Sequence, residues 1–365
     1  MRSRRVGAST FFRLMHEHGT ARAALEALPE VARAAGVTDY KPCPLAVAEA
    51  ELRAARYAGA KFIAFGNPDY PAQLSDLSDP PPFLWTIGDI SLLKRPIVAL
   101  VGARNASSLG TRMARKLAGE LGEAGHVVVS GLARGIDTAA HKATLKTGTI
   151  AVMASGVDVI YPNENTVLGE EIGRDGLRLS EAPMGTSPQA RHFPQRNRII
   201  SGLARAVVVV EAAARSGSLI TARMALDQGR EVLAVPGHPF DARASGCNML
   251  IRDGARLVRA ADDVIEALGE MPTETPQVHD EAPKAEPKAA AKPAIPAAPP
   301  EKRTKAEIRK LHKQILDRLG PSPMAEDQLI RDLALPAARV TPELTNLELD
   351  GKIERQPGGL ITRRN

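Results

Sequence analysis

Residues 206–235 read AVVVVEAAARSGSLITARMALDQGREVLAV. Two apolar runs rich in β-branched side chains, Ala206–Val210 and Val232–Val235, flank a segment with the composition of a helix. A strand, a loop of small residues, a helix and a second strand, in that order, are typical of a parallel α/β sheet. The sequence therefore predicts an α/β fold in which this segment forms one strand–helix–strand unit.

The loop at the start of that helix, Ser216-Gly217-Ser218, has features that suit a phosphate. It combines hydroxyl groups, a glycine and the free amides of a helix start. Ligands of open α/β sheets bind at the carboxyl ends of the strands, which is where this loop lies. Upstream, Arg196 and Arg198 flank Asn197. We therefore expect an anionic ligand that bears phosphate.

The composition narrows the class of protein. A chain of 365 residues, of which 44% are hydrophobic, can form two or three domains with a real core. A net charge of +6 fits a polyanionic partner, and it equally fits a solvated basic surface. Aromatic residues make up only 3%, which argues against a nucleic-acid site built mainly on base stacking.

Cys43 and Cys247 are the only cysteines, which is too few for a disulfide framework or a cysteine-rich zinc site. They fit a reducing compartment. No apolar run is long enough for a membrane span, and the basic N-terminus lacks the apolar core of a signal peptide. We therefore predict a cytoplasmic location and no membrane partner.

The N-terminal part of the chain, residues 1–70, has apolar residues at helical spacing with turns at Gly7 and His18-Gly19. Short helices joined by such turns predict a SAM-like, helix-hairpin-helix domain. It either contacts DNA phosphates through its loops or only packs, and we favour packing. Prolines near its end predict an extended connection over residues 71–95.

The α/β pattern occupies the rest of a central domain at 71–270. The expected strands are Ile97–Val101, Val127–Ser130, Ile150–Ala154, Arg178–Glu181, Ala206–Val210 and Glu231–Val235. A helix over Gly110–Gly125 completes the first crossover, and Ala261–Leu268 is expected to be the closing helix.

The C-terminal part divides into a linker and a small domain. Residues 271–300 hold 8 of the 28 prolines and no aromatic residue, which predicts a semi-extended Pro/Ala-rich linker. Residues 301–365 show three helical patterns and a hairpin, which are typical of a winged helix. The expected elements are helices at Ala306–Leu319, Ala325–Leu333 and Thr341–Asp350, then a hairpin of Lys352–Arg355 and Gly359–Arg364.

The charges of this winged helix support two roles. Arg355, Arg363 and Arg364 suit duplex DNA. The third helix, however, carries the acidic residues Glu343, Glu348 and Asp350, which would repel phosphates in a groove. We therefore favour a protein-interaction module.

The first strand leads into the loop VGARNASSLG, residues 101–110. Gly102 permits a tight turn, and Gly110 allows the helix start to approach a ligand closely. Arg104 presents a fork of donors at the same place. Because any turn of this kind needs a glycine, the loop identifies no ligand by itself.

The second strand leads into SGLARGIDTAAH, residues 130–141. Ser130, Asp137 and His141 are the residue types of a catalytic triad, but no nucleophile-elbow pattern is present. We interpret Asp137 as a cap that holds the loop, and His141 as a polar contact on the helix. Tyr161, beyond the third strand, either stacks on a base or packs against the sheet edge.

Motifs for nucleotide hydrolysis and metal binding are missing from the sequence. It contains neither G-x-x-x-x-G-K-[ST] nor H-E-x-x-H, and it has no Cys/His cluster. What remains is a ring of loops rich in Gly, Ser and Arg without an activated nucleophile. We therefore predict a phosphate-chain binding site rather than an enzyme, with no metal and no cofactor.

Several strings occur together and in order: VGARNASSLG, SGLARGIDTAAH, GTIAVMASGVDVIYPNEN, LSEAP, FPQRNRIISGLA, VVVVEAAARSGSLITARMALDQGR, AVPG and GCNMLIRDGA. Over residues 75–267 the chain resembles the DNA processing protein A (DprA, also Smf) family. The resemblance implies an extended Rossmann-like core that binds single-stranded DNA. It further implies a homodimer that loads a RecA-type recombinase during natural transformation. It also implies that the sequence begins within the first helix of the N-terminal domain.

Carried over motif by motif, the resemblance implies DNA contacts in the loops of the sheet edge. With Gly102 of the first turn included, the implied residues are Arg104, Ser107, Gly110, Ser130, Gly131, Arg134, Gly135, Arg196, Asn197, Arg198, Ser216, Gly217 and Ser218. The alternative is an enzyme of the phosphoribohydrolase kind that acts on a nucleoside monophosphate. Such enzymes carry P-G-G-x-G-T-x-x-E, and the corresponding region Glu211–Ala222 has no glutamate at that spacing.

Overall fold

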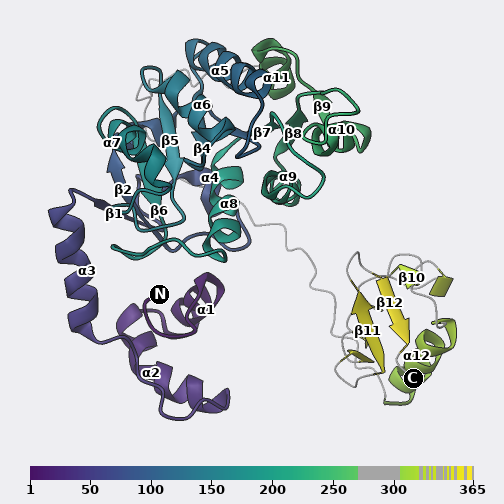
Figure 1. Ribbon diagram of the computed structural model, residues 1–365. Helices are drawn as coiled ribbons and strands as arrows, with labels where there is room; N and C mark the ends of the chain where they lie inside the picture. Colours follow the sequence, from purple (N-terminus) through teal and green to yellow (C-terminus); the bar gives the residue numbers. More distant parts are fainter. Residues whose placement is uncertain are drawn as a thin grey trace, which may run out of the picture. The chain divides into compact units, whose positions relative to one another are not determined.

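The protein is described by a computed structural model that covers residues 1–269, 305–319, 324–325, 329, 332–333, 340, 343–344, 347–348, 352–356 and 360–363. The chain divides into two units, Met1–Pro276 and Gln277–Asn365 (Figure 1). The predicted linker at 271–300 lies outside the described residues. Among the described residues, no helix combines the length and the apolar character that crossing a membrane requires.

Three helices open the first unit. They are α1 (Ala8–His18), α2 (Ala21–Ala34) and α3 (Leu45–Tyr57). Leu14, Ala24 and Leu28 form a small apolar core between α1 and α2. The prediction of a helical segment up to residue 70 is wrong after Tyr57, because Lys61–Ala64 forms strand β1 and pairs with the main sheet.

A nine-stranded sheet forms the centre of the first unit, in the order β1-β2-β6-β5-β4-β3-β7-β8-β9 (Figure 1). The other strands are β2 (Phe83–Gly88), β3 (Ile97–Val101), β4 (Val127–Ser130), β5 (Thr149–Val152), β6 (Leu177–Ser180), β7 (Ala206–Val209), β8 (Glu231–Ala234) and β9 (Arg256–Leu257). The β1–β2 and β2–β6 pairs are antiparallel, and all others are parallel. The six predicted strands are confirmed to within two residues at each end.

Helices cover both faces of the sheet, which is why its central strands β3, β4, β5 and β7 consist almost entirely of buried apolar side chains. One apolar core joins the sheet to α4 (Ala72–Ser75), α8 (His192–Leu203), α9 (Gly217–Asp227) and α10 (Ser245–Arg252). On the opposite face lie α5 (Ser108–Glu123), α6 (Ile136–Thr144), α7 (Thr166–Asp175) and α11 (Ala261–Leu268). The carboxyl ends of the parallel strands and the starts of the helices therefore meet at one edge.

The second unit contains α12 (Lys305–Arg318) and a three-stranded antiparallel sheet of β10 (Met324–Ala325), β12 (Leu360–Arg363) and β11 (Ile353–Gln356). Ala325 lies in a strand, so the prediction that it begins the second helix is wrong. Glu343 is buried, and its Oε2 lies 2.8 Å from Nε2 of His312. Its charge therefore faces its own domain and does not repel a ligand, whereas Asp350 lies outside the described residues.

Candidate functional site

Two adjoining cavities lie at the carboxyl edge of the parallel strands. The larger, about 570 Å³, is lined by seven of the predicted residues, namely Gly102, Arg104, Arg196, Asn197, Ser216, Gly217 and Ser218. The smaller, about 320 Å³, is lined by Gly131, Arg134, Tyr161 and Phe193 and shares Arg104 with the larger. The structure thus brings together most of the loops that the sequence pointed to.

The loop after β4, residues 131–134, is held by buried side chains through its amides. The carboxylate Oδ2 of Asp137 accepts from the backbone N–H of Gly131 at 3.1 Å and of Ala133 at 3.3 Å. Between them, the N–H of Leu132 donates to Nε2 of His141 at 3.2 Å. Each of the three successive amides thus has a side-chain acceptor on α6.

The three carbonyl oxygens of the same residues also have side-chain partners. The carbonyl of Gly131 accepts from Arg196 Nη1 at 2.7 Å. The carbonyl of Leu132 accepts from Asn165 Nδ2 at 2.9 Å, and that of Ala133 accepts from Thr138 Oγ1 at 2.7 Å. Six polar groups of three consecutive residues are therefore satisfied by side chains from α6, α8 and the short turn Asn163–Asn165. This network makes the loop a rigid wall of the smaller cavity.

Asp137 and His141 have structural roles that differ in detail from the predicted ones. The N-cap of α6 is Gly135, and Asp137 bonds amides of the preceding loop, so it holds that loop as expected but does not cap its own helix. Burial raises the pKa of its carboxyl, although Arg196 opposes that shift. His141 is fully buried, and burial lowers its pKa to about 3, with Arg196 adding to the effect.

Arg196 lines the larger cavity as a buried cation with 7% of its surface exposed. It belongs to helix α8, so the prediction that it lies in a strand-end loop is wrong. Its Nη1 also donates to the carbonyl of Val152, and its Nε has no partner. Burial lowers the pKa of the guanidinium to about 10, so the group stays charged near neutral pH. A Cβ on Gly131 would lie 2.2 Å from Nη1, which explains why glycine is needed there.

Cationic and aromatic side chains form a row at the mouth of the cavities. The guanidinium carbon of Arg104 lies 5.0 Å from the centre of the Phe193 ring, and that ring lies 6.0 Å from the ring of Tyr161. Tyr161 is 46% exposed, so it lines the cavity rather than packing fully against the sheet. Arg134 is also exposed, and its Nη1 lies 3.6 Å from Oε1 of Glu164. Exposed ion pairs of this kind are weak, so the Arg134 side chain can exchange Glu164 for another anion.

The start of α9 opens onto the larger cavity. Ser216 is its N-cap and accepts from the N–H of Ser218 at 3.3 Å, and the two hydroxyls lie 2.5 Å apart. Gly217 is exposed between them. The free amides of a helix start carry partial positive charge, so this loop adds to the charge of Arg104 and Arg196.

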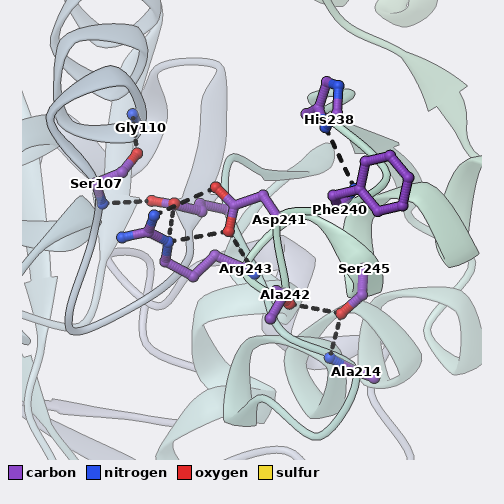
Figure 2. Close-up of polar contacts among 10 residues, drawn as sticks. Ser107, Gly110, Ala214, His238, Phe240, Asp241, Ala242, Arg243 and Ser245 are labelled. Carbon is purple, nitrogen blue, oxygen red and sulfur yellow. Dashed lines mark hydrogen bonds and ion pairs between the residues drawn. The ribbon is translucent and has the colours of Figure 1, made fainter.

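The start of α5 is different because a carboxylate of the protein already occupies it. Oε2 of Glu211 accepts from the N–H of Ser107 at 2.9 Å, and Ser107 Oγ accepts from the N–H of Gly110 at 2.9 Å. A Cβ on Gly110 would lie 2.2 Å from that carboxylate oxygen. Figure 2 shows Arg243 beside this helix start, with its Nε 3.4 Å from Glu211 Oε1 and 3.1 Å from Asp241 Oδ1. The carboxylate of Glu211 thus occupies the place at the start of α5 where an external anion would otherwise bind.

Some predicted contact residues lie outside the two cavities. Ser107 and Gly110 line a separate cavity beside Glu211. Ser130 is fully buried and donates to the carbonyl of Leu100 at 2.6 Å, so the prediction that it contacts a ligand is wrong. Arg198 lines another cavity, where it is paired with Glu181 at 2.5 Å and Asp79 at 3.2 Å.

Two of the predicted glycines serve backbone packing. A Cβ on Gly102 would lie 2.6 Å from the side chain of Ile136, and one on Gly135 would lie 2.2 Å from the carbonyl of Ala103. Gly135 also has a φ of +78°, which favours glycine. They allow the first two loops to approach each other closely.

Sequence reasoning missed Phe193 and Asn165 as parts of the site. Phe193 lies three residues before Arg196, and in a chain with only 3% aromatic residues that position is a signal that could have been used. Asn165 acts through Leu132, a contact that no local pattern reveals. Among the described residues, no group of His, Cys, Asp and Glu side chains is arranged to hold a metal ion.

Comparisons with known proteins identify the family. The family model for DNA recombination-mediator protein A matches residues 61–269. The chain belongs to this family. Models for the DprA-like N-terminal HHH domain and the DprA winged helix domain match residues 1–54 and 285–359.

Individual relatives agree with that assignment. The chain is 49% identical over 209 residues to DNA processing protein DprA of Streptococcus pneumoniae, which covers 56% of this chain and 74% of that protein. It is 36% identical over 302 residues to protein Smf of Escherichia coli, which covers 81% and 75%.

Two solved structures share the fold of the central domain. The structure of Streptococcus pneumoniae DprA has a TM-score of 0.56 and 45% identity, and the match covers 58% of this chain and 75% of that one. That of Helicobacter pylori DprA, solved for its single-stranded DNA binding mode, has a TM-score of 0.53 and 31% identity over 58% and 97%.

Proposed function

We propose that this protein binds single-stranded DNA along the carboxyl edge of its sheet. The observation that carries the proposal is the row formed by the exposed Arg104 and Tyr161 with the half-buried Phe193 between them, beside the buried charge of Arg196. Arginines and a helix start offer contacts to phosphates, and aromatic rings offer contacts to bases. Stacking needs unpaired base faces, which a duplex hides. The single-stranded DNA binding of the Helicobacter pylori relative supports the same ligand class.

The site supports binding rather than catalysis. Both ring nitrogens of His141 are bonded inside the fold, to Leu132 and Thr149, and Asp137 bonds two backbone amides. Neither group is therefore free for proton transfer to a ligand. Glu211, the acidic residue after β7, is likewise bound to Ser107 and Arg243. These contacts argue against the alternative of a phosphoribohydrolase.

In the cell, the bound strand would be handed to a RecA-type recombinase by a homodimer in the cytoplasm. The membership of the recombination-mediator family supports this role. For the winged helix we propose contact with a protein partner. Glu348, whose side chain is exposed in that domain, supports this choice because a carboxylate repels DNA phosphates.

The proposed function is tested by fluorescence anisotropy with a labelled oligo-dT strand and with a duplex of equal length. We expect preference for the single strand and a loss of affinity with rising salt, because phosphate contacts release counterions. An assay for base release from AMP, run with the same preparation, is expected to show no turnover. Equal affinity for the duplex, or turnover of AMP, would contradict the proposal.

The mediator role has its own test. Recombinase filament assembly is followed on single strands coated with a single-strand binding protein, with and without this protein. Faster assembly in its presence is expected. Unchanged assembly would leave a DNA-binding protein that is not a mediator.

A further inference from the structure

The loop after β4 carries an unusual backbone conformation in a buried place. Leu132 has a φ of +54°, although it is not a glycine, and its side chain is fully buried with Ala151, Met153 and Leu168. A left-handed conformation persists in such a residue only when its surroundings hold it. Burial of the leucine fixes the loop from the side of the core, and the polar contacts of its backbone must fix it from the other side.

His141 provides the contact at the centre of this loop. The N–H of Leu132 can only donate, so Nε2 of His141 must be the unprotonated acceptor and Nδ1 must carry the proton. Nδ1 then donates to Thr149 Oγ1 at 2.7 Å, and that hydroxyl donates to the carbonyl of Val128 at 3.2 Å. A chain of directed bonds therefore runs from strands β4 and β5 through the imidazole to the loop.

We infer that His141 is a positioning residue for DNA binding: it holds the backbone of residues 131–134 so that Gly131, Ala133 and Arg134 present one wall of the smaller cavity to a single strand. This inference rests on the proposed function. The residue itself touches no ligand, because none of its surface is exposed. Its lowered pKa, about 3, keeps the imidazole neutral and the acceptor intact near neutral pH.

The test compares three variants of the full chain. His141→Leu removes the acceptor for the Leu132 amide. His141→Gln restores an acceptor near the position of Nε2 and serves as the conservative rescue. His126→Leu is the matched control, because His126 is also buried, at 4% exposure, but precedes β4 at the opposite edge of the sheet.

Two quantities are measured for each variant: the hydrogen exchange rate of the Leu132 amide, and the dissociation constant for an oligo-dT strand. We expect His141→Leu to speed exchange and to weaken binding about tenfold, because a buried amide without a partner destabilises the ordered loop. His141→Gln should recover most of both. His126→Leu should alter thermal stability without altering either quantity.

The outcomes separate this inference from the proposed function. If the wild type does not bind the strand, the proposed function fails whatever the loop does. If the wild type binds, and His141→Leu exchanges Leu132 rapidly yet binds equally well, the positioning role is overturned. Should His141→Leu not fold, Thr149→Val replaces it, because it removes the hydroxyl that orients the ring. A fall in affinity that His126→Leu does not share supports the inference, and unchanged affinity overturns it.

Discussion

At the amino edge of the nine-stranded sheet, Arg95 and Arg205 donate to backbone carbonyls, whereas at the carboxyl edge Arg104, Arg134 and Arg196 line the two cavities. Arg95, which precedes β3, donates to the carbonyls of Thr147 at 2.7 Å and Gly125 at 3.1 Å. Arg205, which precedes β7, donates to the carbonyl of Leu268 at 2.9 Å. Arg104, which follows β3, lies exposed on an aromatic ring.

The direction of the helices explains this difference. In a parallel α/β fold each helix runs opposite to its strands, so helix ends gather at the amino edge and helix starts gather at the carboxyl edge. Helix ends carry partial negative charge, and the protein neutralises it with its own arginines. Helix starts carry partial positive charge, and here arginines add to it. Arg104 has no ion pair among the described residues, so its charge is available to an external anion at this edge.

The largest effect is expected when one arginine at each edge is replaced by alanine and the two variants are compared. Arg104→Ala is expected to weaken binding of an oligo-dT strand by about 1.5–3 kcal/mol, because it removes a charge-assisted phosphate contact. The slope of log affinity against log salt should fall by about 0.7 for one lost contact to a single strand. Fluorescence anisotropy titrations at several salt concentrations measure both quantities.

Arg95→Ala is the matched control for Arg104→Ala. It should lower the free energy of unfolding by about 1–2 kcal/mol, because two carbonyls lose a charged donor, and it should leave the affinity unchanged. Unfolding of this unit can be followed through Trp85, the single tryptophan, which lies buried in β2. If Arg95→Ala weakened binding as much as Arg104→Ala, the contrast between the edges would not hold.

Each edge also buries a neutral histidine, namely His141 at the carboxyl edge and His126 at the amino edge. Both should make the free energy of unfolding depend on pH. The pKa of His141 is about 3 in the fold against 6.5 for the ordinary group, so only the unfolded chain takes up a proton between these values. Stability is therefore lost as pH falls below 6.5, by up to about 1.4 kcal/mol per pH unit. His141→Gln should be less sensitive to acid than the wild type when urea unfolding is followed over that range.

His126 allows a comparison with the other edge. Burial, followed by the nearby Arg205 and Arg95, lowers its pKa as well. His126→Leu should therefore reduce acid sensitivity in the same direction. Equal acid sensitivity of the wild type and both variants would show that neither histidine is held neutral in the fold.

Much of the sheet was predictable because parallel strands buried on both faces consist of short β-branched runs. Val127–Ser130 and Ala206–Val209 are such runs. Strands β1 and β2 escaped prediction because they pair antiparallel at one side of the sheet, and their sequences, KFIA and FLWTIG, lie next to helical and proline-rich segments. Their place depends on pairing between segments distant in the sequence.

The site was predictable as a set of loops but not as a set of contacts. Arg196 and Arg198 look equivalent in the sequence, yet two positions along a helix point to different sides, and only Arg196 lies near both the cavity and the loop after β4. Ser130 ends its strand facing the core, whereas Arg134 of the same motif reaches the surface. The spacing of the motifs predicts which loops lie at the site, and the tertiary fold decides which of their side chains remain accessible to a ligand.

The start of α5 differs from the start of α9 because Glu211 supplies a negative charge there, and it yields the smallest expected effect. Glu211→Gln keeps an oxygen that can accept from the Ser107 N–H, but it removes the charge beside the helix start and the ion pair with Arg243. The free energy of unfolding should fall by about 0.3–1 kcal/mol. Affinity for an oligo-dT strand should rise by a similar amount, about 0.3–1 kcal/mol, because the edge gains net positive charge.

A lower free energy of unfolding together with a higher affinity for DNA distinguishes the effect of Glu211→Gln from general damage to the fold. Asp253→Asn is the control, because it removes an exposed carboxylate paired with Arg252 at the end of α10 and should change neither quantity measurably. Urea unfolding and anisotropy titration at low salt, where charge effects are least screened, measure the two free energies. Weaker binding by Glu211→Gln would mean that Glu211 holds the DNA-binding conformation of the first loop and does not merely occupy the place of an external anion.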